Sequence, residues 1–149
     1  MGLLDWLFGK SGPNRGVQEW RHQLPEPQAL GKLEGSGDFD FDIVGESKYQ
    51  QNLLAIAGPK TEDGCEIERE ATLHREPGNP HDANAIRVDI HGKTVGYIPR
   101  GDAAAIAPIM DKRGIAIVRV DALVIGGWSR KGSEGSFGVK LDMPFEQRR

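Results

Sequence analysis

Four polar side chains able to bind or orient a ligand lie close together in the chain, at Asn79, His81, Asp82 and Asn84. A carboxylate accepts hydrogen bonds, an imidazole ring can stack on a base, and an amide both donates and accepts. Two prolines and a glycine within residues 76–80 prevent regular strand pairing, so the chain must turn there. We therefore expect the four side chains to crowd one loop above a sheet.

Alternating apolar and polar residues indicate the strands that must position this loop. One strand ends at residues 71–75, a second covers residues 85–90, and its hairpin partner covers residues 94–98 after a turn at residues 91–93. The remaining strand pattern consists of residues 115–125, a glycine-rich hairpin loop at residues 126–136 and a returning strand at residues 137–141.

The spacing of apolar residues becomes helical after residue 100. Gly101 and Asp102 are expected to cap a helix whose apolar stripe continues to Met110. Pro108 cannot donate a hydrogen bond to the carbonyl of Ala104, so the pattern predicts a kink or a restart at that position. Such a helix would fold over one end of the β structure.

The composition favours one β-dominated domain. A chain of 149 residues with 38% apolar content can bury a core without covalent staples. The 20 glycines and the short strand-like runs favour β structure over a helical bundle.

Three motifs in this chain resemble the HIRAN domain family. They are VGESKYQ at residues 44–50, LHREP at 73–77 continuing as NPHDANAI at 79–86, and VGYIPR at 95–100. The resemblance covers roughly residues 41–145. It implies a small OB-like or SH3-like β-barrel of about six strands with one or two short helices. We assign residues 38–147 to this barrel and residues 1–37 to an N-terminal apolar segment with a flexible linker, which forms a flexible N-terminal tail.

The same resemblance implies a nucleic-acid binding module that grips single-stranded DNA at its free 3′ end, in the context of DNA repair. Asp82 matches the family aspartate and is the expected acceptor for the terminal hydroxyl, and it would repel a 3′ phosphate. His81 stands where the family usually has tyrosine, and Lys48 replaces one member of an aromatic pair. The predicted DNA-binding residues are Lys48, Tyr49, Asn79, His81, Asp82, Tyr97, Arg100, Phe137, Trp128 and Arg130.

Several of these residues have a second interpretation that the sequence leaves open. Tyr49, Tyr97 and Phe137 can equally pack in the core or across strands. Trp128, with Arg130 beside it, can form a strand-binding loop tip or lie back on the sheet. The amides of Asn79 and Asn84 commonly satisfy their own backbone. Arg100 precedes a helix and can meet a phosphate there, although Asp102 would compete with that anion.

The net charge of −3 is unusual for a protein that binds phosphate, but the charge is unevenly distributed. Acidic residues outnumber basic ones in residues 59–82, whereas basic residues outnumber acidic ones in residues 86–131. This pattern is compatible with a basic face on an acidic protein and with an ordinary solvated surface.

The sequence predicts no catalysis, metal site or cofactor. His74, His81, Asp82 and His91 lack metal-ligand spacing, and no nucleophile motif or GxxxxGK loop occurs. The single Cys65 excludes an internal disulfide and favours a reducing cytoplasm. No stretch reaches the roughly 20 apolar residues that span a bilayer, and no leader pattern is present. We expect a cytoplasmic protein without stable membrane insertion.

An apolar segment at residues 3–8 precedes the linker-like residues 10–37. Leu3, Leu4, Leu7 and Phe8 have helical spacing before Gly9. This segment is either a tail or flap against the barrel, or a docking peptide for a membrane surface or a partner groove. It motivates an alternative function, a protein-interaction adaptor that binds an unidentified protein partner through the barrel edge or this segment.

Overall fold

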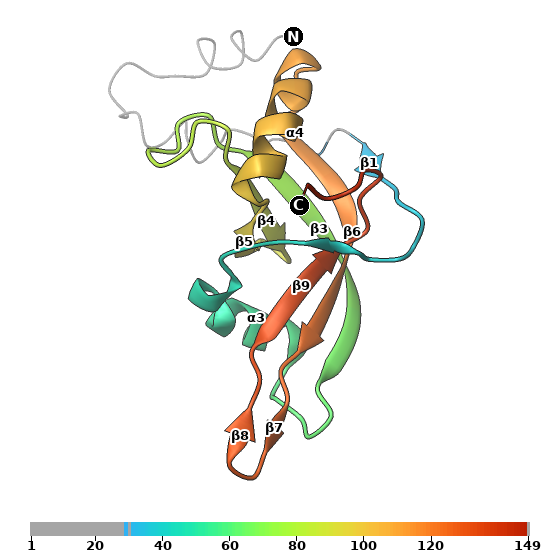
Figure 1. The fold of residues 1–149 in the computed structure, drawn as a ribbon, viewed down its shortest axis with the longest axis vertical. Helices are drawn as coiled ribbons and strands as arrows, with labels where there is room; N and C mark the ends of the chain where they lie inside the picture. Colours follow the sequence, from blue (N-terminus) through green and yellow to red (C-terminus); the bar gives the residue numbers. More distant parts are fainter. Residues whose placement is uncertain (1–28, 30, 149) are drawn as a thin grey trace, which may run out of the picture.

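A single curled sheet dominates the computed structural model, which describes Ala29 and residues 31–148 (Figure 1). The strand order is β2-β9-β6-β3-β4-β5, and β1 adds in parallel to β6. The sheet strands are β1 Lys32–Leu33, β2 Phe41–Asp42, β3 Cys65–Arg75, β4 Ile86–Ile90, β5 Lys93–Tyr97, β6 Ile117–Gly126 and β9 Phe137–Leu141. A small hairpin, β7 Ser129–Arg130 and β8 Ser133–Glu134, extends beyond the sheet.

The two longest strands, β3 and β6, form the backbone of the sheet and pair antiparallel along ten residue pairs. Alternate residues of each strand enter the core, as Ala71 and Leu73 do on β3 and Val118 and Val120 do on β6. The period of two arises because successive side chains point to opposite faces of a sheet. The strands predicted at residues 85–90, 94–98, 115–125 and 137–141 are confirmed to within two residues at each end, whereas only the end of β3 was predicted.

Residues 41–44 connect the two edges of the sheet. β2 pairs with β9 at one edge, and Val44 bridges Tyr97 of β5 at the other. The Val44 and Tyr97 backbones exchange two N–H···O hydrogen bonds of 2.9 Å each. The sheet therefore curls into a half-barrel, and the predicted β-dominated barrel class is confirmed.

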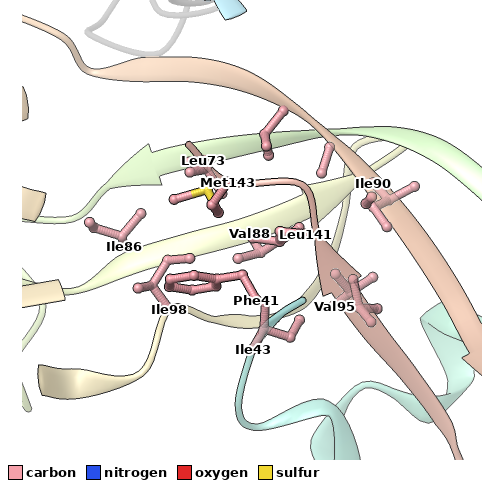
Figure 2. Close-up of a cluster of buried hydrophobic side chains, with 14 of the residues drawn as sticks. Phe41, Ile43, Leu73, Ile86, Val88, Ile90, Val95, Ile98, Leu141 and Met143 are labelled. Atoms are coloured by element: carbon pink, nitrogen blue, oxygen red, sulfur yellow. The ribbon is translucent and has the colours of Figure 1, made fainter. Parts of the chain in front are cut away.

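A single hydrophobic core fills the concave side of this half-barrel. Figure 2 shows Phe41 at its centre, with side chains from β4, β5 and β9 around it. Val88 and Leu141 are fully buried, and Met143 closes the core after β9. This packing fixes the positions of the strand ends that carry the polar loop.

The helices differ from the sequence prediction in two ways. The 3-10 helix η1 Glu46–Lys48 and the helix α3 Gln50–Ala57 were not predicted, although Leu53 and Ile56 are buried at helical spacing. The helix α4 Arg100–Lys112 continues through Pro108 without interruption, so the predicted restart at Pro108 is wrong. Pro108 lies on the exposed side of α4, where water can satisfy the carbonyl that it leaves unpaired.

The start of α4 also differs from the prediction. Pro99 is the N-cap residue, so Asp102 belongs to the first turn of the helix instead of capping it. The Asp102 side chain is buried and accepts a 2.8 Å hydrogen bond from the backbone N–H of Arg148. This carboxylate faces the C-terminal segment but still lies in the first turn of α4, so its competition with a bound anion stays a prediction.

The predicted apolar segment at residues 3–8 lies outside the described residues. β1 lies within the predicted linker and pairs with β6 through Lys32 and Leu33. The described part of the linker thus contributes a strand to the sheet.

Candidate nucleic-acid interface

A groove of about 370 Å³ opens at the end of the sheet where the loop of residues 76–85 meets η1 and the start of α4. Its floor is apolar, because Ala85 and Ile98 belong to or border the core. Its walls carry aromatic rings, cations and one carboxylate. The polar and aromatic residues that line it are Lys48, Tyr49, Asn79, His81, Asp82, Tyr97 and Arg100.

The loop of residues 76–85 is held by its own side chains. Asn79 Oδ1 accepts hydrogen bonds from the backbone N–H groups of His81, at 2.8 Å, and Asp82, at 3.2 Å. Asp82 Oδ1 accepts a third from the N–H of Asn84, at 2.9 Å. Asn79 and Asp82 thus form consecutive turns of the kind in which an Asx side chain replaces a backbone acceptor. These bonds fix the direction of the Asp82 side chain.

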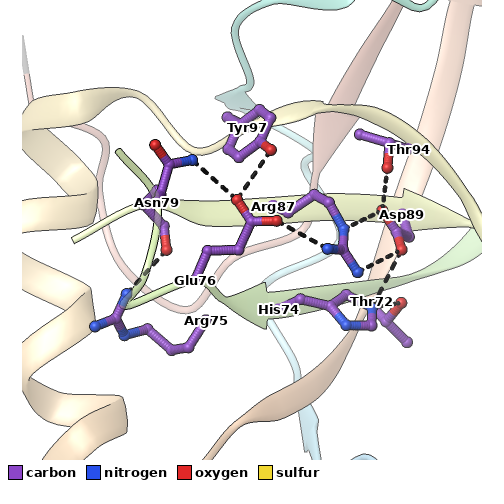
Figure 3. Close-up of polar contacts among 10 residues, drawn as sticks. Thr72, His74, Arg75, Glu76, Asn79, Arg87, Asp89, Thr94 and Tyr97 are labelled. Carbon is purple, nitrogen blue, oxygen red and sulfur yellow. Dashed lines mark hydrogen bonds and ion pairs between the residues drawn. The ribbon is translucent and has the colours of Figure 1, made fainter. Parts of the chain in front are cut away.

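Glu76 connects this loop to the strands beneath it (Figure 3). Its Oε1 accepts hydrogen bonds from Asn79 Nδ2 at 3.0 Å and from the Tyr97 hydroxyl at 2.9 Å, while Oε2 lies 2.8 Å from Arg87 Nη1. Burial alone would raise the pKa of Glu76, but the hydrogen bonds from Asn79, Tyr97 and Arg87 outweigh it and lower that pKa. Burial, together with the hydrogen bond to Glu76, raises the pKa of Tyr97 to about 12.

A second layer of polar groups supports Glu76 from the sheet. Arg87 binds both oxygens of the buried Asp89, at 2.9 and 3.1 Å, and Thr94 Oγ1 donates to Asp89 Oδ1 at 3.0 Å (Figure 3). His74 Nε2 lies 3.5 Å from Asp89 Oδ2, and burial lowers the pKa of His74. The charge on Arg87 is therefore matched by two carboxylates, which keeps it out of the groove.

Arg75 attaches the far end of the loop to α4. Its Nη1 donates to the Ala85 carbonyl at 2.9 Å and its Nη2 donates to the Ala83 carbonyl at 3.1 Å. The same guanidinium binds both oxygens of Asp111, at 2.8 and 3.0 Å. The Arg75 side chain is only 5% exposed, so this planar group is enclosed by its partners. The loop is thereby held at both ends.

Asp82 and Arg100 form the charged pair of the groove. Arg100 Nε lies 3.5 Å from Asp82 Oδ2, and Arg100 Nη2 donates to the His81 carbonyl. The Arg100 side chain is 74% exposed, so its guanidinium can move at small energetic cost. The Asp82 side chain is only 21% exposed, and one of its oxygens is fixed by the hydrogen bond from the loop.

Seven of the ten predicted site residues come together in this groove, and three do not. Phe137 is buried in the core, where its backbone exchanges hydrogen bonds of 2.9 Å with the Gln50 side chain. A Cβ on Gly127 would lie 2.0 Å from the Phe137 ring, which shows how tightly this ring is covered. The structure thus places Phe137 among core residues, outside the groove.

Trp128 directly precedes β7 and Arg130 ends it, and the β7–β8 hairpin lies at the opposite end of the molecule from α4 (Figure 1). The Arg130 guanidinium stacks 5.0 Å above the Trp128 ring and donates to the Glu62 carbonyl. The ring rests against Gly135, where a Cβ would approach it to 2.1 Å. The indole therefore lies on the hairpin itself, whereas the second interpretation placed it on the sheet.

The basic residues of segment 86–131 do not form one continuous face along the groove. Arg100 alone of that segment lines it, joined by Lys48 from η1. Arg87 is paired with Glu76 and Asp89, and Arg119 lies 3.6 Å from Glu70 on the sheet. Positive charge in the groove is therefore local.

Sequence reasoning missed the residues that position the groove. Arg75 and Glu76 are part of the LHREP motif, but nothing in the sequence shows that their side chains turn toward the loop. Val44 and Ile98 add apolar surface, and their place beside Tyr97 depends on the bridge that closes the sheet.

Two findings concern Ala29 and residues 31–148, the part of the chain that the structure describes. No three His, Cys, Asp or Glu side chains of this part of the chain are arranged to hold a metal ion. The helices of the same part are too short or too polar to cross a bilayer.

A half-barrel sheet with a polar groove at one end defines a small β-barrel binding domain. The HIRAN domain profile matches residues 36–126, so the chain belongs to the HIRAN domain family. Members of this family are in general DNA-binding modules.

Known proteins resemble this chain in part. The helicase-like transcription factors of Mus musculus, Oryctolagus cuniculus and Homo sapiens are 40%, 38% and 34% identical over 74 residues. These alignments cover 49% of this chain but only 6% or 7% of those proteins. The crystal structure of the HIRAN domain of human HLTF aligns with a TM-score of 0.37 and 22% identity, over 68% of this chain and 70% of that one.

Proposed function

We propose that the groove binds the 3′-hydroxyl end of single-stranded DNA, with Asp82 accepting the hydrogen bond of the terminal hydroxyl. The single observation that carries this proposal is the Asp82 carboxylate, held in the groove by the loop and placed beside an exposed cation. An ionised carboxylate can only accept, so it pairs with a hydroxyl and repels a phosphate.

Asp82 Oδ2 is the oxygen that accepts the hydrogen bond of the terminal hydroxyl. Oδ1 is occupied by the N–H of Asn84, whereas Oδ2 contacts only the exposed Arg100 among the described residues, at 3.5 Å. A terminal hydroxyl can replace this long contact with a short charge-assisted hydrogen bond. A 3′ phosphate at the same point would bring two anions together in a partly buried groove.

Arg100 and Lys48 supply the positive charge that a DNA backbone needs. Both are exposed at the rim of the groove, and Arg100 is the first residue of α4, whose N-terminal N–H groups favour an anion. On binding, Arg100 turns from Asp82 toward the last phosphodiester. In this exchange the terminal hydroxyl replaces Arg100 as the partner of Asp82 Oδ2.

The rings of Tyr49, His81 and Tyr97 supply stacking surface for the last bases. All three line the groove, and the hydroxyl of Tyr97 is fixed by Glu76. Stacking of a base on an aromatic side chain contributes roughly 1–3 kcal/mol and tolerates any sequence. We therefore expect end-specific binding with little base preference.

Binding without catalysis is part of this proposal, as is a role in DNA repair. The adaptor alternative remains a prediction. It requires protein binding that survives loss of the groove, whereas the end-binding proposal requires DNA affinity that depends on it.

Fluorescence anisotropy tests the proposal on the full chain. A labelled single strand with a free 3′ hydroxyl is compared with the same strand carrying a 3′ phosphate and with a blunt duplex. We expect binding to the hydroxyl strand to be at least about tenfold tighter than to either competitor, which corresponds to roughly 1.4 kcal/mol. Equal affinities for the three ligands, or no binding to any of them, would overturn the proposal.

A further inference from the structure

The surface beside the second half of α4 is apolar and unlike the groove described above. Ile109 of α4 and Phe145 of the C-terminal segment are 50% and 40% exposed, although both are large hydrophobic residues. They separate two adjoining hollows of about 90 and 230 Å³ and line both. We call this surface the α4 trough, formed by Leu33, Ile106, Ile109, Met110, Ile115 and Phe145.

The trough has the features of a surface that is covered in the working protein. Large apolar side chains that line a common hollow mark a docking site, whereas single exposed ones are ordinary. Two of the four exposed large hydrophobic residues of the described chain lie here. The rim is of mixed charge, with Arg113 and Arg148 beside Glu146.

The chain itself leads into this trough. Leu33 of β1 forms part of the wall, and residues 1–28 precede it. Residues 9–32 can span up to about 80 Å when extended, more than twice the ~30 Å diameter of a small domain. A segment at residues 3–8 can therefore reach any point of the trough.

The side chains of that segment match the trough in kind. Leu3, Leu4, Leu7 and Phe8 have the spacing of one apolar helix face, the pattern of helix-in-groove recognition. Asp5 is the single charged side chain of residues 1–9, and Arg113 and Arg148 at the rim are the cations with which it can pair.

We propose that residues 3–8 of the same chain dock in the α4 trough. A tether of this length keeps the local concentration of the segment near the millimolar range, above that of a second copy in solution. The docked segment covers Ile109 and Phe145 and leaves the DNA groove open, because that groove lies at the first turn of α4. This proposal is independent of the end-binding function.

Photocrosslinking in the full chain tests it. A p-benzoylphenylalanine residue replaces Leu7, and crosslinked peptides are mapped by mass spectrometry. We expect an intrachain crosslink to residues 105–115 or 143–146. Ile109→Asp should lower its yield about tenfold, because a charge would be buried under the segment. Phe145→Ser provides a second variant that should act in the same direction.

Leu54→Asp is the matched control, because Leu54 is a leucine of comparable exposure, 39%, on α3. This variant should leave the crosslink yield unchanged, and thermal melts should show all variants folded. Three results would each overturn the proposal: a crosslink between two chains, a crosslink elsewhere or none at all, and an equal loss of yield in Leu54→Asp.

Discussion

Glu76 does not line the DNA groove but positions residues that do. It accepts hydrogen bonds from Asn79 and Tyr97, which do line the groove, and binds Arg87 beneath them. Removing the carboxylate would deprive Asn79, Tyr97 and Arg87 of one hydrogen-bond acceptor each, in a partly buried place. The identity of Glu76 thus matters through the positions of other residues.

Glu76→Gln tests this position through the pH dependence of stability. The pKa of Glu76 is lowered in the folded state, so the unfolded state binds more protons in acid and stability falls as pH drops below about 4.5. We expect the substitution to cost about 1–3 kcal/mol at pH 7 and to reduce the acid slope. Urea unfolding at several pH values measures both quantities.

Glu62→Gln is the control for that series, because Glu62 is an exposed carboxylate in another loop.

His74 also lowers stability in acid, but from a higher pH. Its pKa is lowered in the folded state, so below its ordinary value of 6.5 the side chain gains a proton when the chain unfolds. An unchanged acid slope in Glu76→Gln would contradict the assigned role.

Arg100→Ala tests the cation of the groove. We expect weaker binding to every single strand and a salt dependence of log K reduced by about 0.7, the value for one lost phosphate contact on single strands. Anisotropy titrations at several salt concentrations measure this slope. Lys112→Ala, at the other end of α4, should change neither quantity. A slope unaltered by Arg100→Ala would exclude Arg100 from phosphate binding.

At the scale of elements, the loop of residues 76–85 is fixed from its two ends by Arg75 and Glu76. A lysine at position 75 keeps the charge but cannot bind two carbonyls and a carboxylate in one plane. Arg75→Lys should therefore raise amide hydrogen exchange in residues 82–86, about tenfold or more, without unfolding the sheet.

Arg69→Lys is the matched control for that exchange experiment. Arg69 lies on the same strand, β3, but within residues 31–148 its guanidinium donates only to the neighbouring Glu68 carbonyl. Exchange in the loop should stay unchanged in this variant. Equal exchange in Arg75→Lys and the unsubstituted chain would show that the loop does not depend on the Arg75 contacts.

The turn before β7 depends on Gly127, which combines a φ of 67° with close contact to the Phe137 ring. Gly127→Ala should cost at least about 2 kcal/mol, because it adds a steric clash to the strain of a positive φ. Gly132→Ala separates the two causes, since φ is 82° there but no atom lies within 4 Å. Similar losses of unfolding free energy in both variants would contradict the predicted clash.

The sequence predicted some elements better than others for physical reasons. β3 and β6 each have one buried face, so alternation marks them clearly. α3 has only eight residues, too few to establish a helical period. Alternation also cannot tell which face of the sheet a residue joins. The sequence therefore could not decide between the groove and the core for Phe137, which is buried in the core.

At the scale of the whole molecule, closure of the sheet creates the groove. The bridge between Val44 and Tyr97 brings η1 and Tyr49 to the loop that carries Asp82, although these segments are far apart in sequence. The family motifs predicted these residues as one site, but the contacts that join them required the structure.

The DNA groove and the α4 trough are two separate surfaces of the molecule, and each has its own proposed occupant. The groove holds polar and aromatic side chains at the start of α4, and the α4 trough is apolar and lies toward its end. The chain aligns with only 6% or 7% of the helicase-like transcription factors, so the other activities of those proteins are not assigned to it.

The most direct test of the central claim is the ratio of the dissociation constants for a 3′-phosphate strand and a 3′-hydroxyl strand, measured before and after Asp82→Asn. We predict a ratio of about ten or more in the unsubstituted chain and a ratio near one in the variant, because the neutral amide no longer repels phosphate. Asp63→Asn, an exposed aspartate outside the groove, should keep the original ratio. A ratio near one in the unsubstituted chain, or one that Asp82→Asn leaves unchanged, would contradict the assignment of Asp82 as the reader of the DNA end.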